Sequence, residues 1–178
     1  MALPDTSMLV AGSAKTWDSS GTTGTITLTS LANGSGREGS KLSFAASSVS
    51  GVTDGALPEY IDVRFESSVA SAATAGNLIE LYFGESDSGT AGTANPGNLT
   101  GADAALSNPD ELKLQCSMVG GLVLSNARGT NVQKQRFRFY PALAYLVPLV
   151  VNKSGQSLSG TAADHKVVAT PYYRTTVD

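Results

Sequence analysis

The run FRFYPALAYLVPLVV, residues 137–151, is the most apolar stretch of this 178-residue chain. It is too short for a membrane-spanning helix, and Pro141 and Pro148 would interrupt one. Its β-branched and aromatic residues are typical of strands, and the turn-like sequence 152–155 follows directly. We therefore predict that the run forms one or two strands, joined at a proline, at the centre of the hydrophobic core.

The overall composition points the same way. Charged residues make up 15% of the chain, and 19 glycines with many serines and threonines replace the Glu, Lys and Leu of a helical protein. The length suits one domain that buries a continuous core. The net charge of −3 gives no general attraction to phosphates or anionic lipid, so we expect neither nucleic acid nor membrane as a partner.

Alternating apolar and polar residues predict further strands around the central run. The cleanest alternation is in residues 60–66, where Ile61, Val63 and Phe65 would face inward, and residues 77–84 repeat it. Weaker patterns predict strands in segments 23–31, 41–45, 112–118, 122–124, 132–140 and 165–174. Helical spacing with capping signals is missing, so helix should be minor. About eight strands with long connections favour an all-β, two-sheet sandwich of the jelly-roll type.

The first twenty residues show no clear period, and we expect an irregular N-terminal arm (1–20) before a single β-sandwich domain (21–178). They also lack the charged start and apolar core of a secretory signal, so we expect no export. The arm holds Trp17, the only tryptophan. Trp17 either caps the core of its own subunit, because a large aromatic gains most from burial, or anchors the arm in a partner.

The residues that could support catalysis or metal binding are few. Cys116 is the only cysteine, which excludes an intramolecular disulfide, and it lies on the apolar face of segment 112–118 as a packed thiol. His165 is the only histidine, and Asp164 beside it would point to the opposite face of a strand. We therefore predict a non-enzymatic protein with no catalytic residues, no cofactor site and no metal site.

A long connection, residues 86–108, has no apolar period and is rich in glycine. Loops of this length usually bind something or move. Glu85, Asp87 and Asp103 could suggest calcium, but their spacing matches no known calcium loop, and acidic residues are common in turns.

Three basic residues stand in a row in segment 132–140. Lys134, Arg136 and Arg138 alternate with Phe137 and Phe139, so they share one face of a strand. The row is either a solvated face that pairs with acidic residues on neighbouring strands, or a basic stripe that binds an acidic partner. The candidate acidic residues are Asp62, Glu66 and Glu80.

Four segments together resemble structural proteins of tailed-bacteriophage virions. They are GTTGTITLTSLANGSGREGSKLSF (21–44), NLIELYFGESDSGT (77–90), SNPDELKL (107–114) and YPALAYLVPLVVNKSGQSL (140–158). The shared features are a Leu-Thr-Ser-Leu…Gly-Arg opening, a Ser-Asp-x-Gly turn after an aromatic residue, and an apolar strand ending in Asn-x-Ser-Gly. This chain has LVPL at 146–149, where the group often has a basic residue and Trp after the proline.

The resemblance implies a jelly-roll capsid decoration, or cement, protein that binds the outside of the head shell and stabilises it. Its partners would be the major capsid protein and further copies of itself, as a homo-oligomer and most simply a trimer. It would be assembled in the bacterial host cytoplasm and end on the capsid surface of the virion. A tail or fibre component is the near alternative. A carbohydrate-binding sandwich is another, with exposed tyrosines gathered on one face from among Tyr60, Tyr82, Tyr140, Tyr145, Tyr172 and Tyr173.

Overall fold

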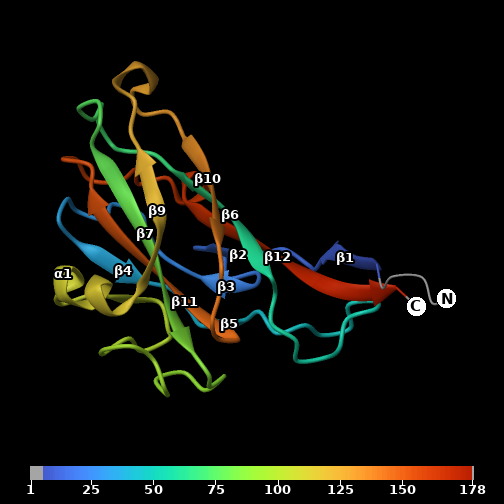
Figure 1. Ribbon diagram of the computed structural model, residues 1–178. Helices are drawn as coiled ribbons and strands as arrows, with labels where there is room; N and C mark the ends of the chain where they lie inside the picture. The colour runs from blue at the N-terminus through green and yellow to red at the C-terminus, as the bar shows by residue number, and fades with distance from the viewer. Residues whose placement is uncertain (1–5, 178) are drawn as a thin grey trace.

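The computed structural model describes residues 6–177 and is a sandwich of two β-sheets (Figure 1). Sheet A contains β1 (Thr6–Ala11), β2 (Lys15–Asp18), β3 (Gly24–Thr25), β6 (Tyr60–Ser67), β10 (Gln133–Phe139) and β12 (Lys166–Val177). Sheet B contains β4 (Gly36–Glu38), β5 (Leu42–Ser43), β7 (Leu78–Ser86), β8 (Ala104–Ala105), β9 (Ser117–Val123) and β11 (Tyr145–Lys153). Helix is limited to α1 (Pro109–Leu112) and the 3-10 turns η1 (Lys113–Gln115), η2 (Asn126–Arg128) and η3 (Ala162–Asp164). Within this described part, no helix has the length and apolar content to cross a membrane.

The strand order is that of a jelly roll. Sheet A runs β10-β6-β12-β2-β3 and sheet B runs β8-β4-β11-β7-β9, with β1 on β12 and β5 on β11. Without β1 and the two-residue strands, eight strands remain, and they form two facing four-stranded sheets, β10-β6-β12-β2 and β4-β11-β7-β9. The predicted fold class is confirmed. Residues 6–177 form twelve strands rather than about eight because β1 and three two-residue strands add short pairings to both sheets.

The central apolar run divides between the two sheets: residues 137–139 end β10 in sheet A, and residues 145–151 form most of β11, in the middle of sheet B. Seven consecutive residues of β11, 146–152, are buried. Leu146 and Val150 belong to the main core between the sheets, while Val147, Leu149 and Val151 belong to a second cluster on the outer side of sheet B. That second cluster also contains Tyr82, Leu99 and Leu112. The run has no polar alternation because the strand is covered on both faces.

Trp17 lies in the main core, and the alternative that it anchors a partner is wrong. Its side chain is 0% exposed, and its ring lies 5.7 Å from the rings of both Phe44 and Phe83. The indole Nε1 donates a 2.7 Å hydrogen bond to the carbonyl of Ser40. A Cβ atom at Gly24 would lie 2.6 Å from the indole ring, so only glycine allows this close approach. No other chain can reach the ring in the folded protein.

The predicted arm therefore divides into parts with different structures. Residues 15–18 are β2 and pair with β12 inside sheet A, and residues 6–11 form β1. Residues 1–5 lie outside the described residues. The irregular sequence pattern arises because only β2 contributes to the core.

Two predicted strands differ from the structure for identifiable reasons. In segment 23–31, Ile26 and Leu28 are buried as the alternation requires, but only residues 24–25 pair with another strand. The backbone N–H of Thr27 instead donates to the carboxylate of Asp103.

In segment 112–118, the first residues are helical and the strand begins at Ser117. Asn108 caps the helix by accepting a hydrogen bond from the N–H of Glu111, and Pro109 occupies the first turn. Cys116 packs against the second cluster, so the packed thiol is confirmed. Burial raises the pKa of this thiol to about 11.

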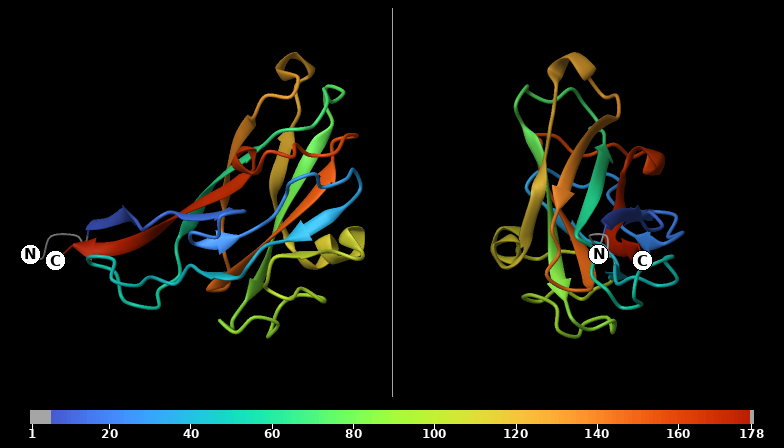
Figure 2. Two further views of the ribbon diagram at one scale, coloured as in Figure 1. Left: turned by 180° about the vertical axis from the view of Figure 1, so that it is seen from behind. Right: turned by 45° about the vertical axis from the view of Figure 1, so that its right-hand side comes forward.

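Strand β12 extends beyond the sandwich. Its first part pairs with β6 and β2, and Tyr172 pairs with both β6 and β1. From Tyr173 onward the strand pairs only with β1, and the β1 register runs from Thr6 opposite Val177 to Ala11 opposite Tyr172. Figure 2 shows this two-stranded ribbon projecting from the sandwich, with the start of β1 and the end of β12 at its tip. We call residues 6–11 and 172–177 the terminal ribbon.

The position of Trp17 predicts different outcomes for two truncations. Deleting residues 1–12 should leave the sandwich folded, whereas deleting residues 1–20 should unfold it, because the longer deletion also removes β2 and Trp17. The loss of a large buried aromatic alone destabilises a core by about 3–5 kcal/mol. Circular dichroism and thermal melting measure both outcomes, with Trp17→Ala in the full chain as the single-residue comparison. A cooperatively melting 21–178 fragment would contradict the assignment of Trp17 to the core.

Candidate functional site

The candidate site is the outer face of sheet A, formed by β10, β6 and β12. Ile61, Val63 and Phe65 of β6 point into the core, so the alternate residues and their cross-strand partners face outward. We call this surface the basic-aromatic face, and it comprises Tyr60, Asp62, Arg64, Glu66, Lys134, Arg136, Arg138, Tyr140, Lys166, Val168, Thr170 and Tyr172. It carries five cationic side chains and two carboxylates, in a chain whose net charge is −3. The face is therefore a local positive region on an acidic protein.

Two members of the predicted basic row pair with carboxylates of β6. Lys134 Nζ lies 3.1 Å from the buried carboxylate of Glu66, and Arg64 Nε lies 2.7 Å from the same group. Arg138 Nε lies 3.6 Å from Asp62. The expected pairing across strands with Asp62 and Glu66 is confirmed. Glu80 is not part of it, because Glu80 lies in sheet B and pairs with Lys113 at 3.3 Å.

Arg136 differs from its two neighbours in the row. Its side chain is exposed, its Cα partner on β6 is Arg64, and no ion pair forms with it among residues 6–177. It borders a shallow groove of about 200 Å³ whose other walls include Asp62, Thr170 and Tyr172. Arg136 is thus a guanidinium held on a rigid strand and available to an external acceptor.

Three tyrosines gather at one end of this face. The rings of Tyr60 and Tyr172 stack with centroids 4.8 Å apart, and Tyr140 lies 6.4 Å from Tyr60. The guanidinium of Arg138 lies 4.1 Å from the centroid of Tyr60, and a hydrogen bond to Tyr140 raises the pKa of Arg138. The other three tyrosines do not join them. Tyr82 and Tyr173 are buried, and Tyr145 lies in sheet B.

His165 and Asp164 do not form a catalytic pair. His165 is 2% exposed, and its Nε2 lies 2.9 Å from the carbonyl oxygen of Ser159. A carbonyl can only accept, so Nε2 carries the proton and Nδ1 accepts from the hydroxyl of Ser67 at 2.9 Å. Asp164 accepts a separate hydrogen bond from Ser68. Burial lowers the pKa of His165, which favours the neutral ring in the folded protein.

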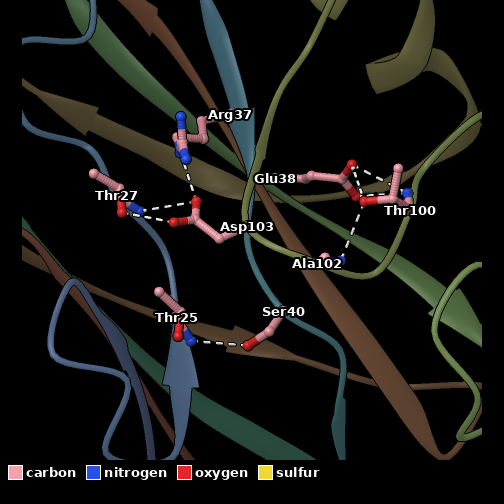
Figure 3. A network of polar contacts seen from close by, with 8 residues as sticks. All are labelled: Thr25, Thr27, Arg37, Glu38, Ser40, Thr100, Ala102 and Asp103. Atoms are coloured by element: carbon pink, nitrogen blue, oxygen red, sulfur yellow. Dashed lines mark hydrogen bonds and ion pairs between the residues drawn. The ribbon is translucent and has the colours of Figure 1, made fainter.

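Two carboxylates hold the long connection 86–108 against the sandwich (Figure 3). Glu38, which is buried, accepts from the backbone N–H and hydroxyl of Thr100 and from the N–H of Gly101. Asp103 accepts from Thr27 and from Arg37. Burial alone would raise the pKa of Asp103, but these hydrogen bonds lower it below its usual value. Both carboxylates therefore have structural partners.

A lysine holds the first part of the same connection. Lys41 Nζ donates to the carbonyls of Ser88, Thr90 and Thr93, each at 2.8 Å, and to the hydroxyl of Ser86 at 3.1 Å. The ammonium group thus lies within a ring of oxygen atoms. In the part of the chain that the structure describes, no three His, Cys, Asp or Glu side chains gather closely enough to hold a metal ion.

The basic row was predicted from alternation, whereas the aromatic half was anticipated only as a choice among six tyrosines, three of which gather here. Tyr60 shares the parity of Asp62 and Arg64, which is a usable signal. Tyr172 is brought beside it only by the pairing of β6 with β12.

Comparison of the chain with models of known protein families and with curated proteins finds no match.

His165 predicts a specific pH dependence of stability. Its pKa is lower in the folded state than the ordinary 6.5. The unfolded chain therefore binds a proton more readily, and the free energy of unfolding should fall as pH drops below about 6.5. His165→Gln should remove this part of the dependence.

At about pH 8, where the ring is neutral in both states, His165→Ala should destabilise the fold by roughly 2–4 kcal/mol through the cavity and the unpaired Ser67 and Ser159 groups. Urea denaturation at several pH values measures both effects. Equal pH slopes for the wild type and His165→Gln would contradict the assignment.

Proposed function

We propose that this protein is a non-enzymatic structural component of a tailed-phage virion, a decoration protein that binds the outside of the head shell. Its partner is the major capsid protein, and it acts as a homo-oligomer. The sequence resemblance described above supports this role. A rigid jelly roll with an exposed, ordered binding face is compatible with it.

The basic-aromatic face is the observation that carries the proposal. Tyrosine and arginine dominate the energetics of protein interfaces, and here Tyr60, Tyr172 and Arg138 are already packed against one another before any partner arrives. Side chains fixed in this way lose little conformational entropy on binding. Arg136 adds an unpaired charge, so the complementary surface on the shell is acidic.

The physical demand on a decoration protein is moderate affinity repeated many times. Contacts that bridge neighbouring shell subunits act together, so each single contact can be weak. A closed symmetric oligomer multiplies the contacts further, and a trimer matches the threefold positions of an icosahedral shell. Light scattering on the purified protein measures this state, and a strict monomer at micromolar concentration counts against the role.

A carbohydrate-binding module is the second candidate, favoured by the tyrosine cluster. Tyr140 is exposed, and the groove beside Tyr172 offers Asp62 and Arg136 as polar groups for sugar hydroxyls. Glycan-array binding by the isolated protein, without affinity for empty heads, would select this candidate. A tail or fibre position is separated from a head position by electron microscopy of the particle.

Charge reversal at Arg136 tests the proposed face. Arg136→Glu should slow binding to undecorated heads by about tenfold at low ionic strength and less at high ionic strength, because interfacial charges mainly steer association. Lys134→Glu is a poorer test, because it would place a second carboxylate beside Glu66.

The matched control is Arg128→Glu, the same charge change at an exposed position on the turn between β9 and β10. It should bind heads like the wild type. Surface plasmon resonance with immobilised heads at two salt concentrations measures both variants. If both variants bind heads like the wild type at both salt concentrations, the basic-aromatic face is not part of the attachment surface.

A further inference from the structure

The terminal ribbon has an open edge on β1. The N–H of Gly12 donates to the carbonyl of Pro171, which fixes the register of hydrogen bonds between β1 and β12. In an antiparallel pair every second residue bonds to the partner strand. The backbone groups of Met8 and Val10 therefore face β12, whereas those of Leu9, Ala11 and the residue at position 7 face away from it.

Side chains of β12 hold the ribbon against the rest of the protein. The hydroxyl of Tyr173 donates to the carbonyl of Phe44 at 2.8 Å, and Thr175 donates to the carbonyl of Gly51. Arg174 pairs with Glu59 at 2.8 Å. The segment between β5 and β6 thus supports β12, and no backbone hydrogen bond from Leu9 or Ala11 to another segment occurs within residues 6–177.

Within residues 6–177, the open edge of β1 has none of the features that protect an edge strand. Natural proteins protect such edges with charged residues, proline, bulges or a covering loop. Residues 6–11 include no charged residue and no proline, and their register with β12 is regular. Met8 is 57% exposed and Leu9 is 51% exposed, on opposite faces of the ribbon. A two-stranded ribbon with this composition gains stability from a further strand.

We propose that β1 pairs in antiparallel orientation with β1 of a second copy, about a twofold axis at Leu9. A second copy fits because antiparallel pairing makes identical strands self-complementary and because the edge carries no charge that would repel its own copy. With Leu9 opposite Leu9, position 7 lies opposite Ala11, so all three outward residues on each strand find partners. The two ribbons then form one four-stranded sheet.

This contact does not depend on the proposed function. It is a twofold contact, so if the protein also forms trimers through another surface, the ribbon joins one trimer to the next. Failure of the protein to bind heads leaves the ribbon contact unaffected, and loss of the ribbon contact leaves the basic-aromatic face intact.

Disulfide trapping tests the register directly. In a Cys116→Ser background, Leu9→Cys places two thiols opposite each other on the axis, with Cα atoms about 5.5 Å apart, within the range that a disulfide spans. Met8→Cys is the matched control, equally exposed and one residue away. Its two copies would lie about 8 Å apart along the paired strands and could not be bridged.

Under mild oxidation at micromolar concentration, Leu9→Cys should give a covalent dimer on a non-reducing gel at least tenfold faster than Met8→Cys. Equal rates for the two variants, or no dimer from Leu9→Cys, would overturn the proposal.

A second variant tests the contact without new thiols. Leu9→Lys places two like charges on the axis, and sedimentation should show at least a tenfold weaker self-association than for the wild type or for Met8→Lys. Circular dichroism confirms that each variant is folded. A wild-type protein that is monomeric at the highest soluble concentration would overturn the proposal. A protein that binds heads only through β1 would overturn it too, because the open edge would then belong to a different partner.

Discussion

Strand β12 is longer than the sandwich it belongs to, and the rest of the structure accommodates that excess. Its 12 residues extend about 40 Å, whereas the neighbouring β6 has 8 residues. The first part of β12 contributes Val167 and Ala169 to the core and lies between β6 and β2. The second part extends beyond these neighbours. There β12 pairs with β1, and the side chain of Thr175 donates a hydrogen bond to the carbonyl of Gly51. One strand therefore connects the hydrophobic core to the terminal ribbon.

Sheet B shows a different solution to the problem of a strongly apolar strand. The outward side chains of β11 are covered by α1 and by the long connection, whose Leu99 and Leu112 complete the second cluster. The connection is polar in sequence, so its few apolar residues could not hold it there alone. Glu38, Asp103 and Lys41 supply charge-assisted hydrogen bonds that fix its backbone. Its length thus serves the packing of sheet B.

Alternation of apolar and polar residues identified β6, β7 and β10 from the sequence, and with β10 the direction of the basic row. The jelly-roll class followed from the number of strands. Trp17 could not be assigned to either interpretation, because β2 has only four residues, and their pairing with β12 is a contact between distant parts of the chain. Residues 112–118 alternate like a strand in the sequence, but the helix cap at Asn108 outweighs this pattern, and residues 109–115 form helical turns instead. The tyrosine cluster depends on the same long-range pairing.

The ring of oxygens around Lys41 has a consequence for the side chain that position 41 accepts. Loops of this kind are often organised by a bound calcium ion, which the surrounding water must supply. Here the cation is covalently part of the chain, and its carbonyl partners lie at 2.8 Å. Lys41 therefore brings a positive charge to these carbonyl oxygens without a dissolved ion. The same arrangement restricts substitution at position 41, because the planar guanidinium of arginine cannot replace a compact ammonium group within this ring of oxygen atoms.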